Sequence, residues 1–298
     1  MSKIILGIDI GNYSTKTSEN INFKNCIDSK DNLFGNKIKL NMDGKIYKIG
    51  EGGNFDTELN KCQKVNYIPF LYTAIALSSQ EIKNSVVVGL PTNQYLKYKD
   101  TLKDLILQNS RKCLLINNTM RQIIIEDVEI YSEALGVYYN LDDDIVDCII
   151  VDIGGRTTDI AYISNGKLVK YDTIPVGTLN IYDDIITELN TKYTLNLDIS
   201  FAERIIDRNY LKVEGKIVDT IFIENILRSN FYQIKEKLDL NYPAKAEQIV
   251  LTGGGSKLFK TAFSKTYLNC TVKEDIYCNA KGFKEVGKNK WQNQKLSV

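Results

Sequence analysis

Two segments of the chain, residues 7–16 and 150–159, follow one pattern. In GIDIGNYSTK and IVDIGGRTTD, an apolar β-branched run leads into an aspartate, and a glycine turn with hydroxyl side chains follows. Such a run predicts a buried strand, and the glycine predicts a tight turn at its end. One Asp-x-Gly turn is common and mostly structural. Two copies in matched context predict two related halves with a ligand between them.

The elements around these segments repeat as well, which supports a duplicated architecture. In the first half we expect a strand over 3–10, a hairpin with strands over 37–40 and 45–49, a helix over 68–77, a strand over 85–90, a helix over 94–108, a strand over 121–128 and a helix over 131–140. In the second half we expect strands over 147–153, 158–163 and 167–174, helices over 180–190, 200–207 and 220–238, a strand over 248–251 and a helix ending near 265.

The chain of 298 residues contains no histidine. This excludes Ser-His-Asp and Cys-His catalysis and histidine-ligated metal sites. Any chemistry must therefore use carboxylates, hydroxyls, amines, backbone amides or a metal with oxygen ligands. Lysine and arginine number 38 against 37 aspartates and glutamates, which leaves a formal net charge of +1. A chain this neutral has no overall field that would attract nucleic acid or an anionic membrane.

The six cysteines form no C-x-x-C pair, and the zinc-site patterns fail without histidine. We therefore expect reduced structural thiols, as in the cytosol, rather than a disulfide framework. No apolar run approaches the ~18 residues of a membrane span, and the N-terminal residues predict a strand rather than a signal peptide. The sequence predicts a cytoplasmic protein without a membrane contact.

The repeated segments suit the binding of a phosphorylated ligand together with a metal ion. A carboxylate at the end of a buried strand holds Mg²⁺ through water, and the amides of the turn after it cradle phosphate oxygens. Lys16 can add a positive charge beside those phosphates. Two facing turns would hold a triphosphate from opposite sides, with Asp9 and Asp152 flanking the metal. The patterns G-x-x-x-x-G-K-[ST] and G-x-G-x-x-G are both absent.

A third glycine segment, IVLTGGGSK at residues 249–257, follows a predicted strand. Its glycines would let the backbone approach a flat ring closely, although this pattern alone is typical of an ordinary strand-to-helix turn. Taken together and in this order, the three segments resemble those of the actin-like ATPase superfamily, and the resemblance covers nearly the whole chain. Residues 9–16 resemble its first phosphate loop, 152–159 its second and 253–257 its adenosine loop.

The resemblance implies ATP as the nucleotide, with GTP as the alternative, and Mg²⁺ held through water by Asp9 and Asp152. Glu133 falls where the superfamily places the residue that orients the attacking water, so the implied catalytic residues are Glu133, Asp152 and Asp9. Glu203 and Arg204 fall where relatives contact the ribose and base. The implied cofactor-binding residues are Gly11, Asn12, Tyr13, Ser14, Thr15, Lys16, Gly154, Gly155, Arg156, Thr157, Glu203, Arg204, Gly253, Gly254, Gly255 and Lys257.

One position departs from the pattern of the superfamily. Arg156 stands where many members have a third glycine. The departure implies a stiffer loop, or one that carries an extra phosphate or filament contact.

The resemblance also implies an α/β fold, namely the actin-like (ribonuclease H-like) duplicated two-domain fold with the nucleotide in the interdomain cleft. Domain I would cover residues 1–145, with a small subdomain at about 28–65. A C-terminal connecting helix at 276–298, in which the stretch NAKGF resembles the returning helix of relatives, would complete it. Domain II would cover residues 146–275, with a small subdomain at about 190–240.

Within the superfamily, size favours the filament proteins, because sugar kinases are generally longer and the chain lacks the peptide-binding domain of a chaperone. Residues 28–64 and 200–210 most resemble the ParM-type plasmid-segregation actins. The resemblance therefore implies an ATPase that polymerises with ATP and Mg²⁺ and segregates plasmid DNA through a centromere-binding adaptor of the ParR type. DNA would be contacted only indirectly. The alternative is a non-polymerising member, either a small-molecule kinase or a reactivating ATPase.

Two regions are candidates for filament contacts. They are a loop at 51–55 and the aromatic stretch 67–72, although the latter would equally well pack inside its own domain. The basic residues 288–295 predict a solvated tail rather than a contact with nucleic acid or membrane.

Overall fold

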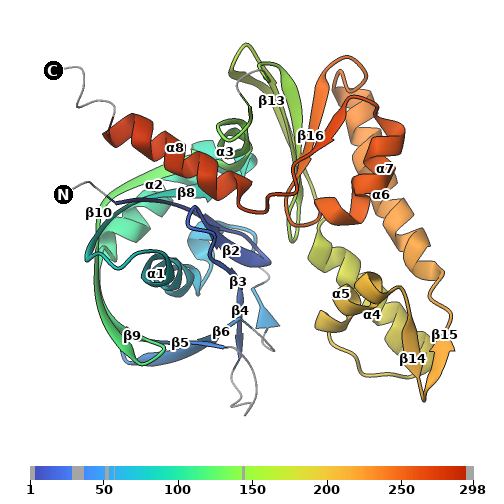
Figure 1. The fold of residues 1–298 in the computed structure, drawn as a ribbon, viewed down its shortest axis with the longest axis horizontal. Helices are drawn as coiled ribbons and strands as arrows, with labels where there is room; N and C mark the ends of the chain where they lie inside the picture. Colours follow the sequence, from blue (N-terminus) through green and yellow to red (C-terminus); the bar gives the residue numbers. More distant parts are fainter. Residues whose placement is uncertain (1–3, 29–36, 51–53, 57, 143–144, 293–298) are drawn as a thin grey trace.

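The computed structural model describes residues 4–28, 37–50, 54–56, 58–142 and 145–292. The loop predicted at 51–55 and the tail predicted at 288–295 therefore lie partly outside the described residues. The chain forms two lobes, each built on its own β-sheet, and helices near the middle of the molecule join them (Figure 1). This is the α/β two-lobed architecture that the duplicated sequence pattern predicts.

The first lobe is a ten-stranded sheet with the order β3-β2-β1-β8-β10-β9-β5-β6-β4-β7. The strands are β1 (Ile5–Ile10), β2 (Ser14–Thr17), β3 (Asn22–Lys24), β4 (Cys26–Asp28), β5 (Ile38–Met42), β6 (Lys45–Ile49), β7 (Asn54–Phe55), β8 (Lys83–Leu90), β9 (Arg111–Ile116) and β10 (Thr119–Ser132). The sheet curls around one helix, α1 (Tyr67–Ser78), and a second helix, α2 (Thr92–Gln108), lies outside it (Figure 1).

Helix α1 is buried on every side. Tyr67, Leu71 and Tyr72 are fully enclosed, because the curled sheet surrounds a helix that carries apolar residues all round. The proposal that 67–72 forms a filament contact is therefore wrong, and the stretch packs inside its own lobe. The buried residues of α1 pack against those of the surrounding strands and form one hydrophobic cluster with them.

Strand β10 is longer than the sequence predicts and contains an irregularity between Ile125 and Asp127. Its first part pairs antiparallel with β9 and its second part pairs parallel with β8. Tyr131 and Ser132 still belong to this ladder, so the helix expected from 131 begins instead at Glu133, as α3 (Glu133–Tyr138). Strand β9 is not predicted from the sequence, because its residues show no clear alternation of apolar and polar side chains.

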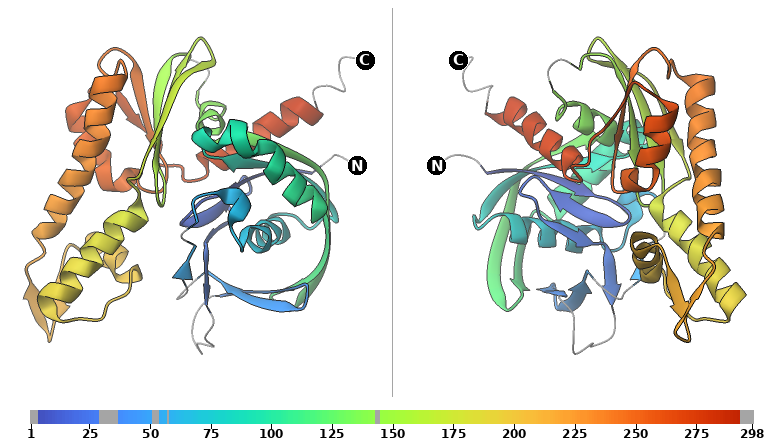
Figure 2. Two further views of the ribbon diagram at one scale, coloured as in Figure 1. Left: turned by 180° about the vertical axis from the view of Figure 1, so that it is seen from behind. Right: turned by 45° about the vertical axis from the view of Figure 1, so that its right-hand side comes forward.

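The second lobe is a five-stranded sheet with the order β13-β12-β11-β16-β17, and a separate two-stranded hairpin. The sheet strands are β11 (Cys148–Ile153), β12 (Thr158–Ser164), β13 (Lys167–Ile174), β16 (Gln248–Thr252) and β17 (Cys270–Val272), and the hairpin is β14 (Leu211–Val213) with β15 (Lys216–Val218). The helices are α4 (Thr178–Tyr193), α5 (Ser200–Arg208), α6 (Phe222–Asn241) and α7 (Ser256–Thr266). Figure 2 shows α6 on the side of this lobe that faces away from the first lobe.

The two sheets repeat one arrangement at their centres. β1 pairs antiparallel with β2 and parallel with β8, just as β11 pairs antiparallel with β12 and parallel with β16. Every residue of β1 and of β11 is buried, because helices cover both faces of each strand. The continuous apolar runs of the repeated segments therefore encode the central strands of both lobes.

The lobes meet at α3 and at α8 (Cys278–Trp291), which returns to pack on β1 and β8. The two helices cross with almost no side chain between them, since a Cβ atom on Gly282 would lie 1.8 Å from the carbonyl oxygen of Gly136. A Cβ atom on Gly7 would likewise lie 1.9 Å from the carbonyl oxygen of Ala280, so α8 also lies directly on β1.

Among the described residues, no helix combines the length and the apolar character that crossing a membrane requires.

Candidate active site

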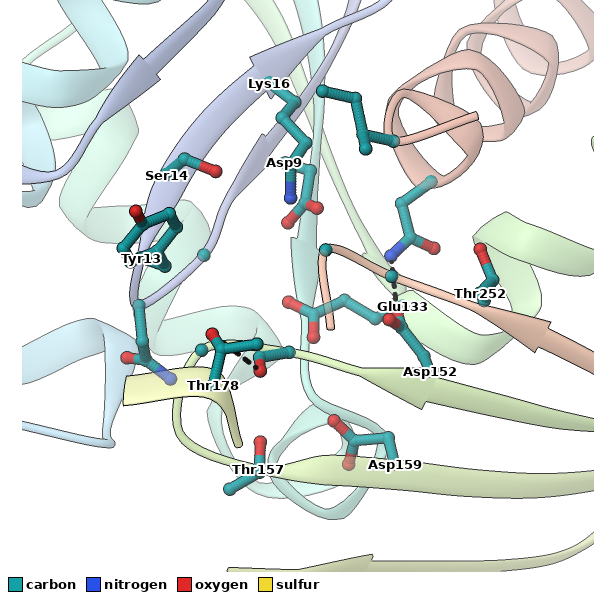
Figure 3. A pocket seen from close by; sticks show the side chains of 18 of the residues that line it. Asp9, Tyr13, Ser14, Lys16, Glu133, Asp152, Thr157, Asp159, Thr178 and Thr252 are labelled. Atoms are coloured by element: carbon teal, nitrogen blue, oxygen red, sulfur yellow. Dashed lines mark hydrogen bonds between the residues drawn. The ribbon is translucent and has the colours of Figure 1, made fainter. Parts of the chain in front are cut away.

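A cavity of about 280 Å³ lies between the lobes and is lined by residues from both. The β1–β2 turn, the β11–β12 turn, the residues after β16 and the start of α8 all contribute to it (Figure 3). The predicted residues that line it are Asp9, Gly11, Asn12, Tyr13, Ser14, Lys16, Glu133, Asp152, Gly154, Gly155, Thr157, Glu203, Gly253, Gly254 and Lys257. Residues that are far apart in the sequence thus converge on one site.

The two glycine turns close in the same way. Gly11 N donates to the carbonyl oxygen of Ser14 at 3.0 Å, and Gly154 N donates to that of Thr157 at 2.8 Å. The turns also meet each other, since a Cβ atom on Gly155 would lie 2.8 Å from the backbone nitrogen of Tyr13. Glycine at 155 therefore lets the backbones of the two lobes approach across the cavity.

Both hairpins aim a buried carboxylate at the cavity. Asp9 and Asp152 occupy the fifth position of their strands and are 7% and 8% exposed. The residue opposite differs, because Asp9 pairs with Lys16 whereas Asp152 pairs with Asp159. Figure 3 shows Asp9 and Lys16 close together, with Asp152 and Asp159 on the facing hairpin. The second lobe therefore contributes two carboxylates where the first contributes one carboxylate and one ammonium.

The negative charges of Asp152 and Asp159 are buried, and the hydrogen bonds that each carboxylate accepts do not fully compensate the loss of water. Burial raises the pKa of Asp152, and the nearby charge of Asp9 raises it further, while a 2.8 Å hydrogen bond from Asn279 Nδ2 opposes the rise. Burial likewise raises the pKa of Asp159 to about 7, although the Thr173 hydroxyl donates to it. Such a cluster favours the binding of a cation.

The described part of the chain contains no group of three or more Asp, Glu, Cys or His side chains placed to enclose a metal ion. An ion held here by Asp9 and Asp152 would therefore complete its coordination with water and ligand oxygens. This donor set suits Mg²⁺, which keeps several waters and binds through one or two carboxylates together with phosphates.

Glu133 lies at the first position of α3 and faces the cavity (Figure 3). Burial raises the pKa of Glu133, Asp9 and Asp159 add to the rise, and the Lys61 ammonium opposes it. The Lys61 Nζ forms an ion pair with the Glu133 carboxylate. This ion pair favours the ionised form of Glu133, which is the form that can accept a proton.

The third glycine segment supports the cavity from the second lobe. Gly253 has a φ of +87°, and a Cβ atom there would lie 2.1 Å from Asp152 Oδ1. Nothing lies within 4 Å of a Cβ atom on Gly254, so this position is open to the cavity. Gly255 instead packs behind the lining, against the side chains of Ile153 and Thr178. Glycine at 253 is required both by its backbone conformation and by space.

Aromatic and charged side chains connect the lobes at one end of the cavity. The Tyr13 ring stacks on the Phe55 ring, with 5.2 Å between the ring centres, and meets the Tyr182 ring edge-on, with 6.5 Å between the ring centres. The Tyr13 hydroxyl donates to Glu203 Oε2 at 2.9 Å, and Lys24 Nζ lies 3.2 Å from the same oxygen. Burial would raise the pKa of Glu203, but these two partners outweigh it and lower the pKa. Glu203 thus bridges from the second lobe to the first.

Some predicted residues do not line the cavity. Thr15 is buried and donates to Asn25 at 2.6 Å, and the Arg204 guanidinium lies 5.0 Å from the centre of the Phe201 ring. Arg156 packs its backbone against Gly177, and its Nε is buried without a hydrogen-bond partner among the described residues. Residues outside the predicted set that line the cavity are Asn22, Lys61, Pro91, Asp159, Thr178, Tyr182, Thr252, Ile276, Cys278 and Asn279.

Two of these residues could have been found from the sequence. Asp159 ends the second repeated segment at the position that Lys16 holds in the first, and Asn279 lies in the stretch that resembles the connecting helix. Lys61 carries no such signal, because its neighbours follow no recognisable pattern.

Comparison with known proteins agrees with this geometry. Residues 7–136 match the family model described as actin like proteins N terminal domain, and residues 150–265 match that described as archaeal actin homologue MreB-like, C-terminal. No curated protein matches the sequence. The fold and the site define an actin-like two-domain protein with a cleft between its lobes. The chain belongs to the actin-like ATPase superfamily.

Solved structures share the fold over nearly the whole chain. The archaeal actin homologue Ta0583 superposes with a TM-score of 0.81 at 17% identity, covering 96% of this chain and 99% of that one. A ParM from a 15-stranded filament of Clostridium botulinum gives 0.77 at 19% identity, covering 97% and 100%. AlfA from the Bacillus subtilis plasmid pLS32 gives 0.60 at 17% identity, covering 94% and 97%. A further Ta0583 structure is a complex with ADP, with a TM-score of 0.79.

The residues present fit an adenine nucleotide with Mg²⁺. The two turns offer backbone amides from facing sides, and the backbone at Gly254 is open to the cavity, with nothing within 4 Å of a Cβ atom there. The buried Asn12 Oδ1 has no partner among the described residues, which leaves it available to a ligand. Lys16 supplies the positive charge that a triphosphate needs.

Proposed function

We propose that this protein is an ATPase that polymerises with ATP and Mg²⁺ and segregates plasmid DNA through a centromere-binding adaptor of the ParR type. One observation carries the catalytic part of the proposal. The two glycine turns come from different lobes, contact each other and surround Asp9, Asp152 and Glu133 in one cavity. A ligand that both turns bind would couple its own chemistry to the relative position of the lobes.

The residues divide the work of hydrolysis between them. The turn after β1 and the side chain of Lys16 would bind the phosphates, and Asp9 and Asp152 would hold Mg²⁺ through water. When bound, Mg²⁺ neutralises charge that develops on the phosphates. Glu133 would orient a water molecule and accept its proton, a role that the ion pair with Lys61 supports because it favours the ionised carboxylate. Tyr13, Tyr182 and the open backbone at Gly254 would enclose the nucleoside.

Polymerisation is supported by what the structural relatives form. ParM from Clostridium botulinum, Alp12 and AlfA were all determined as filaments, and the AlfA chain comes from a plasmid. Closure of the lobes around the nucleotide would reshape the surfaces that meet the next subunit, so that ATP favours the polymer. A nearly neutral chain suits a protein that meets copies of itself and reaches DNA through an adaptor.

The test is light scattering of the purified protein after addition of ATP and Mg²⁺, with negatively stained samples viewed by electron microscopy. We expect scattering and filaments with ATP, and parallel samples with GTP decide the nucleotide preference. Glu133→Ala should still polymerise but release phosphate far more slowly. Scattering that stays flat across tens of micromolar protein, with phosphoryl transfer to a small molecule instead, would favour the non-polymerising alternative.

A further inference from the structure

Lys61 is a buried lysine in the cavity wall that lies outside all three glycine segments. It begins the 3-10 helix η1 (Lys61–Gln63), between β7 and α1, and its side chain is 3% exposed. Burying an ammonium group costs free energy unless a partner of opposite charge compensates it. The role of Lys61 should therefore follow from its partners.

Those partners are the carboxylate of Glu133 and a backbone carbonyl group. The Lys61 Nζ pairs with the Glu133 carboxylate and donates a 3.2 Å hydrogen bond to the carbonyl oxygen of Gly89. Burial lowers the pKa of Lys61, but the charges of Glu133, Asp9 and Asp159 outweigh this and raise it above the usual value. Lys61 is therefore a fixed positive charge facing an acidic cavity.

The backbone of η1 is tied to the helix beside it. Lys61 N donates to Gln94 Oε1 at 3.4 Å, and Gln94 Nε2 donates to the carbonyl oxygen of Leu59 at 2.9 Å. The Asn60 side chain caps η1 by accepting a 3.0 Å hydrogen bond from the backbone. Since Gln94 belongs to α2, the ammonium group reaches the cavity from an anchored position.

Glu133 has little freedom on its other side. A Cβ atom on Gly89 would lie 3.0 Å from Glu133 Cγ, so the side chain lies against the backbone of β8. Within the described part of the chain, Lys61 is the cation that forms an ion pair with this carboxylate. The backbone of β8 and the ammonium of Lys61 together define where the carboxylate points.

We propose that Lys61 is a positioning residue for ATP hydrolysis, which acts through Glu133 by holding its carboxylate where it can align the attacking water. The inference rests on the proposed ATPase function. It assigns a role in the chemistry to the segment before α1, which contains none of the glycine turns. Without the ammonium, the carboxylate would rotate or bind a proton and would align water less often.

The experiment compares Lys61→Met and Lys61→Arg with the wild type, in single-turnover phosphate release and in binding of a fluorescent ATP analogue. We expect Lys61→Met to lower kcat by about thirtyfold while the nucleotide Kd changes by less than about threefold. Lys61→Arg should restore at least about a third of the rate, because it keeps a cation in reach of the carboxylate. Lys64→Met is the matched control, since Lys64 is also buried but does not line the cavity, and its kcat should match the wild type.

A double-mutant cycle with Glu133→Gln separates action through Glu133 from an independent effect. We expect Lys61→Met to cause no further loss of kcat in the Glu133→Gln background. In the nucleotide-free protein, Lys61→Met should lower Tm in the wild type but not in Glu133→Gln, where the ammonium has already lost its charged partner. This second readout does not depend on activity.

The possible outcomes are distinct. Multiplicative losses of kcat in the cycle, or a large rise in Kd with kcat unchanged, would show that Lys61 binds the nucleotide instead of positioning Glu133. A Lys61→Met rate equal to the wild type would overturn the inference and leave the proposed function standing. A wild-type protein that hydrolyses no ATP would overturn both, whatever the Tm values show.

Discussion

The β1–β2 and β11–β12 hairpins have the same turn closure but differ in charge, since the first pairs an aspartate with a lysine and the second pairs two aspartates. Each places an aspartate at the fifth position of a buried strand and closes its turn by one glycine hydrogen bond. The partner across the ladder is Lys16 in the first hairpin and Asp159 in the second. The two hairpins thus have the same backbone arrangement, and the side chain opposite the aspartate, Lys16 or Asp159, determines which charge each hairpin attracts.

The difference assigns two tasks to two hairpins. The hairpin with Lys16 attracts phosphate, whereas the hairpin with two buried carboxylates attracts a cation and disfavours an anion. The carboxylate of Glu133 faces the same cavity as the two aspartates of the second hairpin. The ammonium of Lys61, from the first lobe, forms an ion pair with Glu133. Four variants test this comparison.

The largest effect should come from Asp152→Asn, which removes charge from the acidic hairpin. We expect hydrolysis to fall by about a hundredfold or more, with a higher Mg²⁺ concentration needed for half-maximal activity. Measuring phosphate release against Mg²⁺ concentration checks this. Asp172→Asn is the control, since Asp172 pairs with Lys237 outside the cavity, and an equal loss there would contradict the special role of Asp152.

The next effect concerns the cation of the first hairpin. Lys16→Met should weaken nucleotide binding by about thirtyfold, because one charge-assisted contact to phosphate is lost. Titration with a fluorescent ATP analogue at two salt concentrations measures it, and the variant should also depend less on salt. Lys45→Met, in the exposed β5–β6 hairpin, should bind as the wild type does. Unchanged affinity in Lys16→Met would mean that phosphate is bound without this lysine.

A smaller effect concerns stability. The pKa of Asp159 in the folded protein is about 7, above the ordinary value, so the folded state binds the proton more tightly. The contribution of Asp159 to stability is then greatest at low pH and falls as pH rises from about 4 through 7. Asp159→Asn removes the free energy that the folded protein spends on keeping this buried carboxylate ionised. The variant should therefore raise the Tm of the nucleotide-free protein by about 3–6 °C at pH 8, but not near pH 4.

Calorimetry without Mg²⁺ at the two pH values provides the measurement. Asp104→Asn, on the exposed side of α2, should change Tm at neither pH. A lower Tm for Asp159→Asn at pH 8 would show that the carboxylate stabilises the empty site.

The smallest effect concerns the contact between the lobes. Tyr13→Phe keeps the stacking on Phe55 but removes the 2.9 Å hydrogen bond to Glu203. The net worth of one hydrogen bond to a charged group is about 1.5–3 kcal/mol, reduced here because Lys24 still pairs with Glu203. We expect a change of about threefold in nucleotide affinity by titration. A change beyond about thirtyfold would indicate that the Tyr13 hydroxyl itself contacts the ligand, in addition to Glu203.

The hairpins were predictable from sequence because their information is local. A β-branched run that ends in Asp-x-Gly sets both the buried strand and the turn, so the sequence alone predicts the positions of Asp9 and Asp152. The convergence of Glu133 on the same cavity required the resemblance to a family, since a glutamate at the start of a short helix carries no signal of its own.

Lys61 and Tyr182 were missed because their positions depend on long-range packing. Lys61 reaches Glu133 across 72 positions of sequence, and no periodicity in its own segment indicates burial. The start of α3 was misplaced for a related reason. Tyr131 and Ser132 read as helical in isolation, but the parallel ladder with β8 holds them extended.

The proposed ATPase and the proposed polymerisation are linked if assembly of the filament completes the hydrolytic site formed by both hairpins, and one measurement tests this central link. Phosphate release and light scattering are recorded together in ATP and Mg²⁺ over a series of protein concentrations. The rate of release per subunit should be low and constant until scattering begins, and should then rise as the polymer accumulates. A rate per subunit that stays constant through the onset of scattering would contradict the link.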